Sequence, residues 1–160
     1  MLFDKIYDEE VLKRIDFLKN LKIFEGIKKK HLIYILENLQ ERKYLKGETI
    51  FAENDIGRAL FIVFSGKVSL YRKDKFEDKN ELISEVHPGE FFGEMALLEE
   101  MPRTATSIAS EETVVFMLFK TKLEHLLFSK PQIGVYLIYH LSRVLSARLR
   151  TYMLGEKENA

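Results

Sequence analysis

The residues that can do chemistry are concentrated in one stretch, His87 to Ile108, which reads HPGEFFGEMALLEEMPRTATSI. Within it Gly93 precedes Glu94, and Arg103 follows nine positions after the glutamate. The residues from Glu94 to Leu98 have the composition of one or two helical turns, and a short helix behind a glycine offers unpaired N–H groups to an anion. An anion alone would be repelled by Glu94. This set of a guanidinium, a carboxylate and free amides therefore suits a ligand that carries both a phosphate and a hydroxyl.

No other motif in the sequence indicates a catalytic or metal site. The chain has no cysteine, which excludes disulfides, thiolate zinc sites and cysteine nucleophiles. Its 4 histidines are scattered, and no two have the i, i+4 spacing typical of ligands on a helix. Ser65-Gly66-Lys67 is interpreted as a hairpin turn, since a phosphate-binding loop would need a glycine five residues before Gly66. We therefore expect no catalytic residue, no bound metal and no cofactor, and a protein that is not an enzyme.

Apolar periodicity predicts the elements that must position this stretch. Helical spacing predicts helices over Asp8–Leu18 and Lys28–Leu39. After Gln40 the period changes to short apolar or alternating runs separated by turn residues, which is typical of a sandwich, jelly roll or small barrel. The predicted strand segments are at Tyr44, Ile50–Phe51, Leu60–Phe64, Val68–Tyr71, Leu82–Val86, Thr104–Ile108 and Thr113–Phe119.

Helical spacing returns after Lys120. Leu123, Leu126 and Leu127 predict a short helix that ends before Pro131, and a long helix runs from Pro131 to about Met153. We expect one domain over residues 1–154, with N-terminal helices in 1–39, strands in 40–119 and C-terminal helices in 120–154. Residues 155–160 are predicted to be a tail.

Two segments in the His87–Ile108 stretch carry a resemblance to a known family. Phe92–Leu98 (FGEMALL) and Pro102–Thr106 (PRTAT) closely resemble the phosphate-binding cassette of the cyclic nucleotide-binding domain family, and here the cassette would span 91–106. That family includes the catabolite activator protein, regulatory subunits of cyclic-AMP-dependent kinase and cyclic-nucleotide-gated channels. The resemblance extends over most of the chain, from Leu21 to Thr151, and implies a mainly β fold with flanking helices. The core would be a double-stranded β-helix (a jelly-roll-like β-roll) between N-terminal helices and a C-terminal short helix plus long helix.

The resemblance implies a role for each cassette residue. Arg103 would bind the cyclic phosphate through a bidentate, charge-assisted contact. Glu94 would accept a hydrogen bond from the ribose 2′-hydroxyl, and backbone N–H groups of Gly93, Ala96 and Thr104 would complete the phosphate site. The full set of expected ligand-binding residues is Gly93, Glu94, Met95, Ala96, Arg103, Thr104 and Ala105.

Base recognition is predicted from fewer features. Leu70, Ile83 and Val86 are expected to form an apolar wall around sugar and base. A hydroxyl at Thr104 can reach the 2-amino group of guanine, so cyclic GMP stays open beside cyclic AMP. In the catabolite activator protein a Thr-Ser pair on the long helix touches the adenine, whereas Arg148 and Leu149 stand there in this chain. Some channel-type domains of the family use an arginine of the last helix as a cap over the base, which Arg148 or Arg150 would do by stacking.

Composition sets limits on partners and location. The 160 residues contain 25 basic and 25 acidic side chains, and a net charge of +0 removes the general electrostatic argument for nucleic-acid binding. No apolar run reaches the length needed to span a bilayer, and the charged N-terminus does not resemble a signal peptide. We therefore expect a cytoplasmic protein that does not contact DNA directly and has no membrane span.

The leading interpretation is a non-catalytic receptor or regulatory module that binds cyclic AMP, or alternatively cyclic GMP, and signals by movement of its C-terminal helices. One alternative is a catabolite-activator-type transcription regulator lacking its helix-turn-helix, and another is a nucleotide-free dimeric scaffold. We expect a homodimer through the 131–153 helix and an output partner that is another protein. The dimer seam would use Leu137, Leu141, Val144 and Leu145, unless that stripe packs back onto its own domain.

Overall fold

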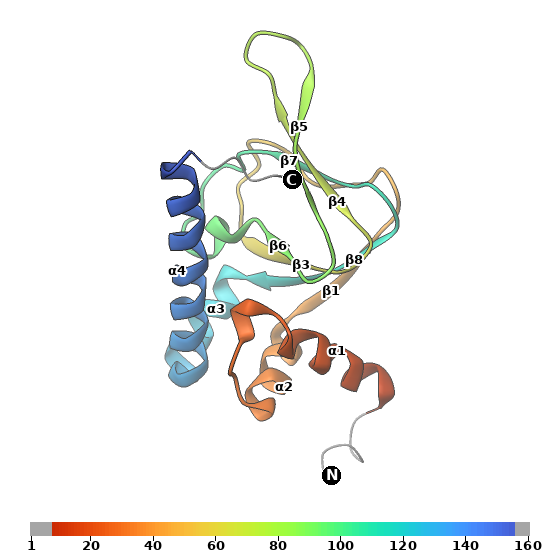
Figure 1. Cartoon of the computed structure of the whole chain (residues 1–160). Helices are drawn as coiled ribbons and strands as arrows, with labels where there is room; N and C mark the ends of the chain where they lie inside the picture. Colours follow the sequence, from red (N-terminus) through yellow and green to blue (C-terminus); the bar gives the residue numbers. More distant parts are fainter. Residues whose placement is uncertain (1–7, 156–160) are drawn as a thin grey trace. The chain divides into compact units, whose positions relative to one another are not determined.

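The computed structural model describes residues 8–155 and divides into two compact units. A helical unit contains the chain up to Leu39 and from Glu124 onward, and a strand unit contains Gln40–Leu123 (Figure 1). The predicted tail lies outside the described residues, except for Gly155.

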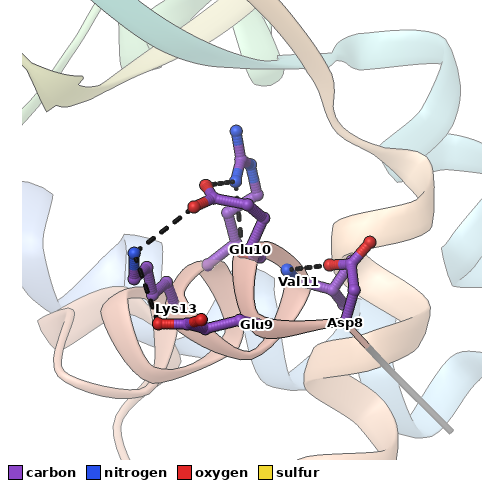
Figure 2. Close-up of polar contacts among 6 residues, drawn as sticks. Asp8, Glu9, Glu10, Val11 and Lys13 are labelled. Atoms are coloured by element: carbon purple, nitrogen blue, oxygen red, sulfur yellow. Dashed lines mark hydrogen bonds and ion pairs between the residues drawn. The ribbon is translucent and has the colours of Figure 1, made fainter.

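The helical unit begins with α1 (Glu9–Lys19) and η2, a 3-10 turn at Lys22–Phe24, followed by α2 (Lys29–Asn38). Asp8 caps α1, because its carboxylate accepts a hydrogen bond from the Val11 N–H at 2.8 Å. Figure 2 shows this cap beside the ion pairs from Lys13 to Glu9 and Glu10. Ile15 and Leu18 on α1 are buried, so the amphipathic pattern of the sequence describes the packed face of this helix.

The C-terminal helices are α3 (Lys120–Ser129) and α4 (Pro131–Met153). The bounds of α4 are those predicted from the sequence, and Pro131 occupies its first turn, where a missing N–H costs nothing. Within the helical unit α3 and α4 approach closely at Gly134. A Cβ atom there would lie 2.7 Å from the Leu127 backbone, so this position accepts only glycine without moving one helix.

The strand unit contains two antiparallel sheets of four strands each, ordered β1-β8-β3-β6 and β2-β7-β4-β5. Strands that are distant in sequence pair in both sheets, as in a β-roll, and β4 and β5 form a hairpin whose turn extends away from the sheets (Figure 1). The strands are β1 (Gln40–Tyr44), β2 (Thr49–Phe51), β3 (Ala59–Ser65), β4 (Val68–Lys73), β5 (Asn80–Val86), β6 (Phe91–Phe92), β7 (Thr106–Ala109) and β8 (Thr113–Phe119).

One apolar core draws on both sheets. Tyr44, Phe61 and Val115 come from the first sheet, and Val68 and Ala109 from the second. Burial of such side chains on facing sheets provides most of the favourable free energy of folding. The architecture confirms the predicted fold class, mainly β with flanking helices, in the form of the family's β-roll.

Two strand predictions need correction. Strand β7 begins at Thr106, whereas the sequence predicted a strand from Thr104, because Thr104 and Ala105 still belong to the loop that carries Arg103. Strand β1 covers Gln40–Tyr44, although only Tyr44 was predicted. Four of its five side chains are exposed, so the strand has little apolar pattern, and as an edge strand it pairs only with β8 in its sheet.

Candidate functional site

The candidate site is a loop between β6 and β7 that contains the short helix η3 (Glu94–Leu97). Gly93 turns the chain into η3 with φ +72°, a left-handed conformation that favours glycine. The chain then returns beside residues 54–57, where the Arg103 N–H donates to the Asp55 carbonyl oxygen at 2.6 Å and the Gly57 N–H to that of Met101 at 3.0 Å. These backbone bonds fix the Cα of Arg103 independently of its side chain.

The Arg103 guanidinium is held by two backbone carbonyl oxygens and two aromatic rings. Its Nη1 donates to the Gly93 oxygen at 3.1 Å and its Nη2 to the Ala59 oxygen at 2.7 Å. Its Cζ lies 4.1 Å from the ring centroid of Phe51 and 5.6 Å from that of Phe61. The guanidinium therefore has a defined orientation beside the start of η3.

Two glycines leave the space that this guanidinium occupies. A Cβ atom at Gly57 would lie 2.9 Å from Cζ and Nε of Arg103 and 2.9 Å from the Ala96 Cβ. A Cβ atom at Gly93 would lie 2.6 Å from the Arg103 Nη1. The orientation of Arg103 thus depends on glycine at both positions.

Burial lowers the pKa of Arg103, while the negative charges of Glu94 and Asp55 act in the opposite direction. An arginine keeps its proton in such a site, because its ordinary pKa is far above neutral. Over residues 8–155, no carboxylate oxygen lies within 4 Å of the guanidinium. A half-buried positive charge that is held by carbonyl dipoles and ring faces can still attract an anion.

The family model "Cyclic nucleotide-binding domain" matches residues 41–130, more than half of the chain. This chain belongs to the cyclic nucleotide-binding domain family. The Cyclic AMP receptor protein of Thermus thermophilus is 34% identical over 133 residues, which are 83% of this chain and 59% of that protein. The crystal structure of the catabolite activator protein of the same organism has a TM-score of 0.75, with 34% identity over 84% of this chain and 61% of that chain.

The name of a human relative contains cyclic GMP, whereas the bacterial relative is named for cyclic AMP. The cGMP-dependent protein kinase 2 of Homo sapiens is 32% identical over 99 residues, which are 62% of this chain and 13% of that protein. This chain spans about three-fifths of the length of the bacterial relatives that it matches. The comparisons therefore define the binding-domain family and not the activity of a whole relative.

The cyclic nucleotide-binding fold brings the predicted cassette residues together in one loop. Glu94 is half-buried in the first turn of η3, Met95 is 61% exposed, and Ala96 is buried. The Ala96 N–H donates to the Gly93 oxygen at 3.2 Å. Thr104 is exposed and Ala105 is buried beyond Arg103.

The predicted apolar wall is divided by the pleat of the second sheet. Leu70 packs against the core, and Val86 is itself a core residue with 5% exposure. Ile83 is 39% exposed at a bulge, because Leu70 pairs with Ser84 while Tyr71 pairs with Leu82. Cross-strand partners share a face of the sheet, so Ser84 lies on the face of Leu70 and Ile83 does not.

Sequence reasoning missed several residues that hold Arg103 and its loop. Phe51 and Phe61 were assigned to strands without a role, and Ala59 was not singled out, although all three contact the guanidinium directly. Arg72 on β4 was also missed; its Nε donates to the Thr104 carbonyl oxygen at 3.2 Å. No sequence signal near Arg103 indicates these contacts, because they join segments up to 52 positions away.

Other predicted features lie elsewhere. Arg148, the predicted base cap, is an exposed residue of α4 in the helical unit, and its role stays a prediction. Among the described residues, no group of three or more His, Asp or Glu side chains is arranged to bind a metal. No helix in residues 8–155 is both long and apolar enough to cross a membrane.

The space at Gly57 generates a stability prediction. We expect Gly57→Ala to lower the free energy of unfolding by about 1–3 kcal/mol, because the new methyl group overlaps Arg103 and Ala96. In the Arg103→Gln background part of that overlap disappears, so the loss should be smaller by about 1 kcal/mol. Urea unfolding of the two single variants and the double variant measures this coupling.

Gly47→Ala provides the matched control for this cycle. A Cβ atom at Gly47 would meet nothing within 4 Å, so its effect should come from the backbone φ of +87° alone. It should be additive with Arg103→Gln within about 0.5 kcal/mol. An equal loss from Gly57→Ala in both backgrounds would show that Gly57 does not hold Arg103 in place.

Proposed function

We propose that this chain is a non-catalytic cyclic nucleotide receptor that binds cyclic AMP in preference to cyclic GMP. The observation that carries the proposal is the oriented guanidinium of Arg103 beside Gly93 and Glu94. Carbonyl oxygens hold two of its five N–H donors, which leaves donors for phosphate oxygens. Glu94, nearby, would accept a hydrogen bond from the ribose 2′-hydroxyl.

The preference for cyclic AMP rests on the name of one relative. The bacterial relative with the highest identity reported above is named as a cyclic AMP receptor. Two points favour cyclic GMP instead. The Thr104 hydroxyl would accept a hydrogen bond from the 2-amino group of guanine, and the kinase relative is named for cyclic GMP. Cyclic GMP is therefore the alternative ligand, and a comparison of the two affinities distinguishes them.

Binding of a phosphate would act first on the short helix of the cassette. The Gly93 oxygen accepts from both the Arg103 side chain and the Ala96 N–H, so a ligand that draws Arg103 toward its phosphate also changes the first turn of η3. We propose that this change favours a different position of the C-terminal helices, which would be the output signal. A ligand shifts such an equilibrium only by its difference in affinity for the two states.

Two alternative functions are retained in the same proposal. A catabolite-activator-type regulator would bind DNA with a salt-dependent affinity, which a mobility-shift assay detects. A nucleotide-free scaffold would keep the fold but bind neither cyclic nucleotide. The arrangement of Arg103 and Glu94 favours the receptor over the scaffold.

The central test is calorimetric titration of cyclic AMP and cyclic GMP into the full chain. We expect saturable binding of one nucleotide per chain, with cyclic AMP the tighter ligand. Arg103→Gln should weaken it by at least about 100-fold, because two charge-assisted hydrogen bonds to phosphate are lost. Arg58→Gln is the matched control, since Arg58 is exposed in the same unit and should leave the affinity unchanged.

Two results would count against the receptor. One is the absence of binding by either nucleotide at about 1 mM, where even a weak site would be occupied. The other is equal affinity in Arg103→Gln and wild type, which would place the phosphate elsewhere. A circular dichroism melt of each variant shows whether lost binding reflects lost folding.

We also propose a homodimer through α4, with a different seam from the one the sequence suggested. Leu137 and Leu141 are each only 2% exposed within the single chain, so these two cannot form the seam, while Val144 and Leu145 are half-buried. The exposed positions alternate at spacings of four and three, as in a coiled coil. These positions are Val135, Tyr139, Ser142, Ser146, Leu149 and Met153.

A charge in this seam should separate the dimer. We expect Leu149→Glu to raise the dimer dissociation constant at least about tenfold, because it buries a carboxylate against its copy. Ala147→Glu places the same charge on the exposed helix outside the seam and should leave the dimer unchanged. Analytical ultracentrifugation measures both constants, and a monomeric wild type at about 100 μM would contradict the proposed seam.

A further inference from the structure

A cavity lies within the helical unit, apart from the cassette loop. Its volume is about 430 Å³, and its wall is formed by α2, the end of α3 and the start of α4. That volume is in the range of pockets that hold small organic ligands. All of its lining residues belong to the helical unit, whereas the whole cassette belongs to the strand unit, so this is a different site.

The wall of this cavity carries positive charge and no negative charge. Lys30 and Lys130 line it, and no aspartate or glutamate does. In the part of the chain that the structure describes, neither lysine is paired with a carboxylate. The Lys130 ammonium lies 5.4 Å from the ring centroid of Tyr34, which attracts a cation without neutralising it.

His31 also lines the cavity, and its pKa is lowered there. Burial lowers its pKa, and the neighbouring charges of Lys30, Lys28 and Lys130 lower it further. At neutral pH the imidazole is therefore uncharged and can donate one N–H. The lysines near it create a positive potential that would favour an anion in the cavity.

The rest of the wall is partly apolar and includes the polar residues Ser129 and Gln132. The Tyr34 ring, Pro131 and Ile133 line it beside the two lysines. Two ammonium groups and one imidazole N–H match the three terminal oxygens of a phosphate better than the two of a carboxylate. The apolar surface would then contact an organic group attached to the phosphate.

We propose that this cavity is a second anion site, which binds a small phosphorylated organic molecule through Lys30, Lys130 and His31. The organic group would lie against Tyr34, Pro131 and Ile133. The inference does not depend on nucleotide binding at Arg103, because no residue is shared by the two sites. The ligand at the junction of α3 and α4 would thus be a different molecule from the nucleotide at the cassette.

Phenyl phosphate is the probe, titrated into the ¹⁵N-labelled full chain and followed by amide chemical shifts. The Arg103→Gln background is used so that binding at the cassette does not contribute. We expect saturable shifts confined to residues 30–34 and 129–133. The Lys30→Gln/Lys130→Gln pair should raise the dissociation constant by about tenfold or more, through loss of two charge-assisted contacts.

Lys19→Gln/Lys22→Gln is the matched control, because both lysines are exposed residues of the helical unit outside the cavity wall. It removes the same charge and should leave the dissociation constant unchanged. Shifts that do not saturate, shifts outside the two segments, or equal weakening by both pairs would overturn the proposal. Inorganic phosphate should bind more weakly than phenyl phosphate, and equal binding would overturn the assignment of an organic group.

Discussion

The positive charge of Arg103 is the constraint on which the cassette depends. A guanidinium that is half removed from water needs hydrogen-bond acceptors, and here the carbonyl oxygens of Gly93 and Ala59 accept from two of its donors in place of a carboxylate. This arrangement holds the side chain without cancelling its charge. A carboxylate partner in direct contact would fix the arginine as firmly but would compete with an anionic ligand.

The need to hold this charge explains several features of the β-roll. Ala59 and Phe61 come from β3 in one sheet, whereas Phe51 comes from β2 in the other, so the guanidinium lies where both sheets contribute. The rings of Phe51, Phe61 and Phe92 pack on one another, with centroids 5.2–5.8 Å apart. The cluster gives Arg103 a rigid aromatic surface, and its rigidity comes from the core.

The sequence predicted the helices and the grouping of Gly93, Glu94 and Arg103 in one loop, because each of those signals is local. The bounds of α4 follow from Pro131 and helical periodicity, and Gly93, Glu94 and Arg103 lie within one short loop. What could not be predicted depends on pairing between distant strands. The bulge at Ile83, where Leu70 pairs with Ser84 but Tyr71 with Leu82, shifts the register of the rest of the β4–β5 pair, and nothing in the β5 sequence indicates it.

The α4 helix shows the same limit for a helical element. Periodicity identifies apolar stripes, but the packing of the surrounding unit decides which of them is covered. Leu137 is buried, while Tyr139, two positions later, is 59% exposed. The sequence therefore predicted the helix and its apolar stripe, but not that Leu137 and Leu141 in this stripe are buried within the chain itself.

The most direct test of this account is a crystal structure of the full chain with cyclic AMP bound. It should show phosphate oxygens about 3 Å from the guanidinium nitrogens of Arg103, with the ribose 2′-hydroxyl on Glu94. The aromatic surface of Phe51 and Phe61 should still lie under the arginine. Nucleotide density with its phosphate away from Arg103 would contradict the account.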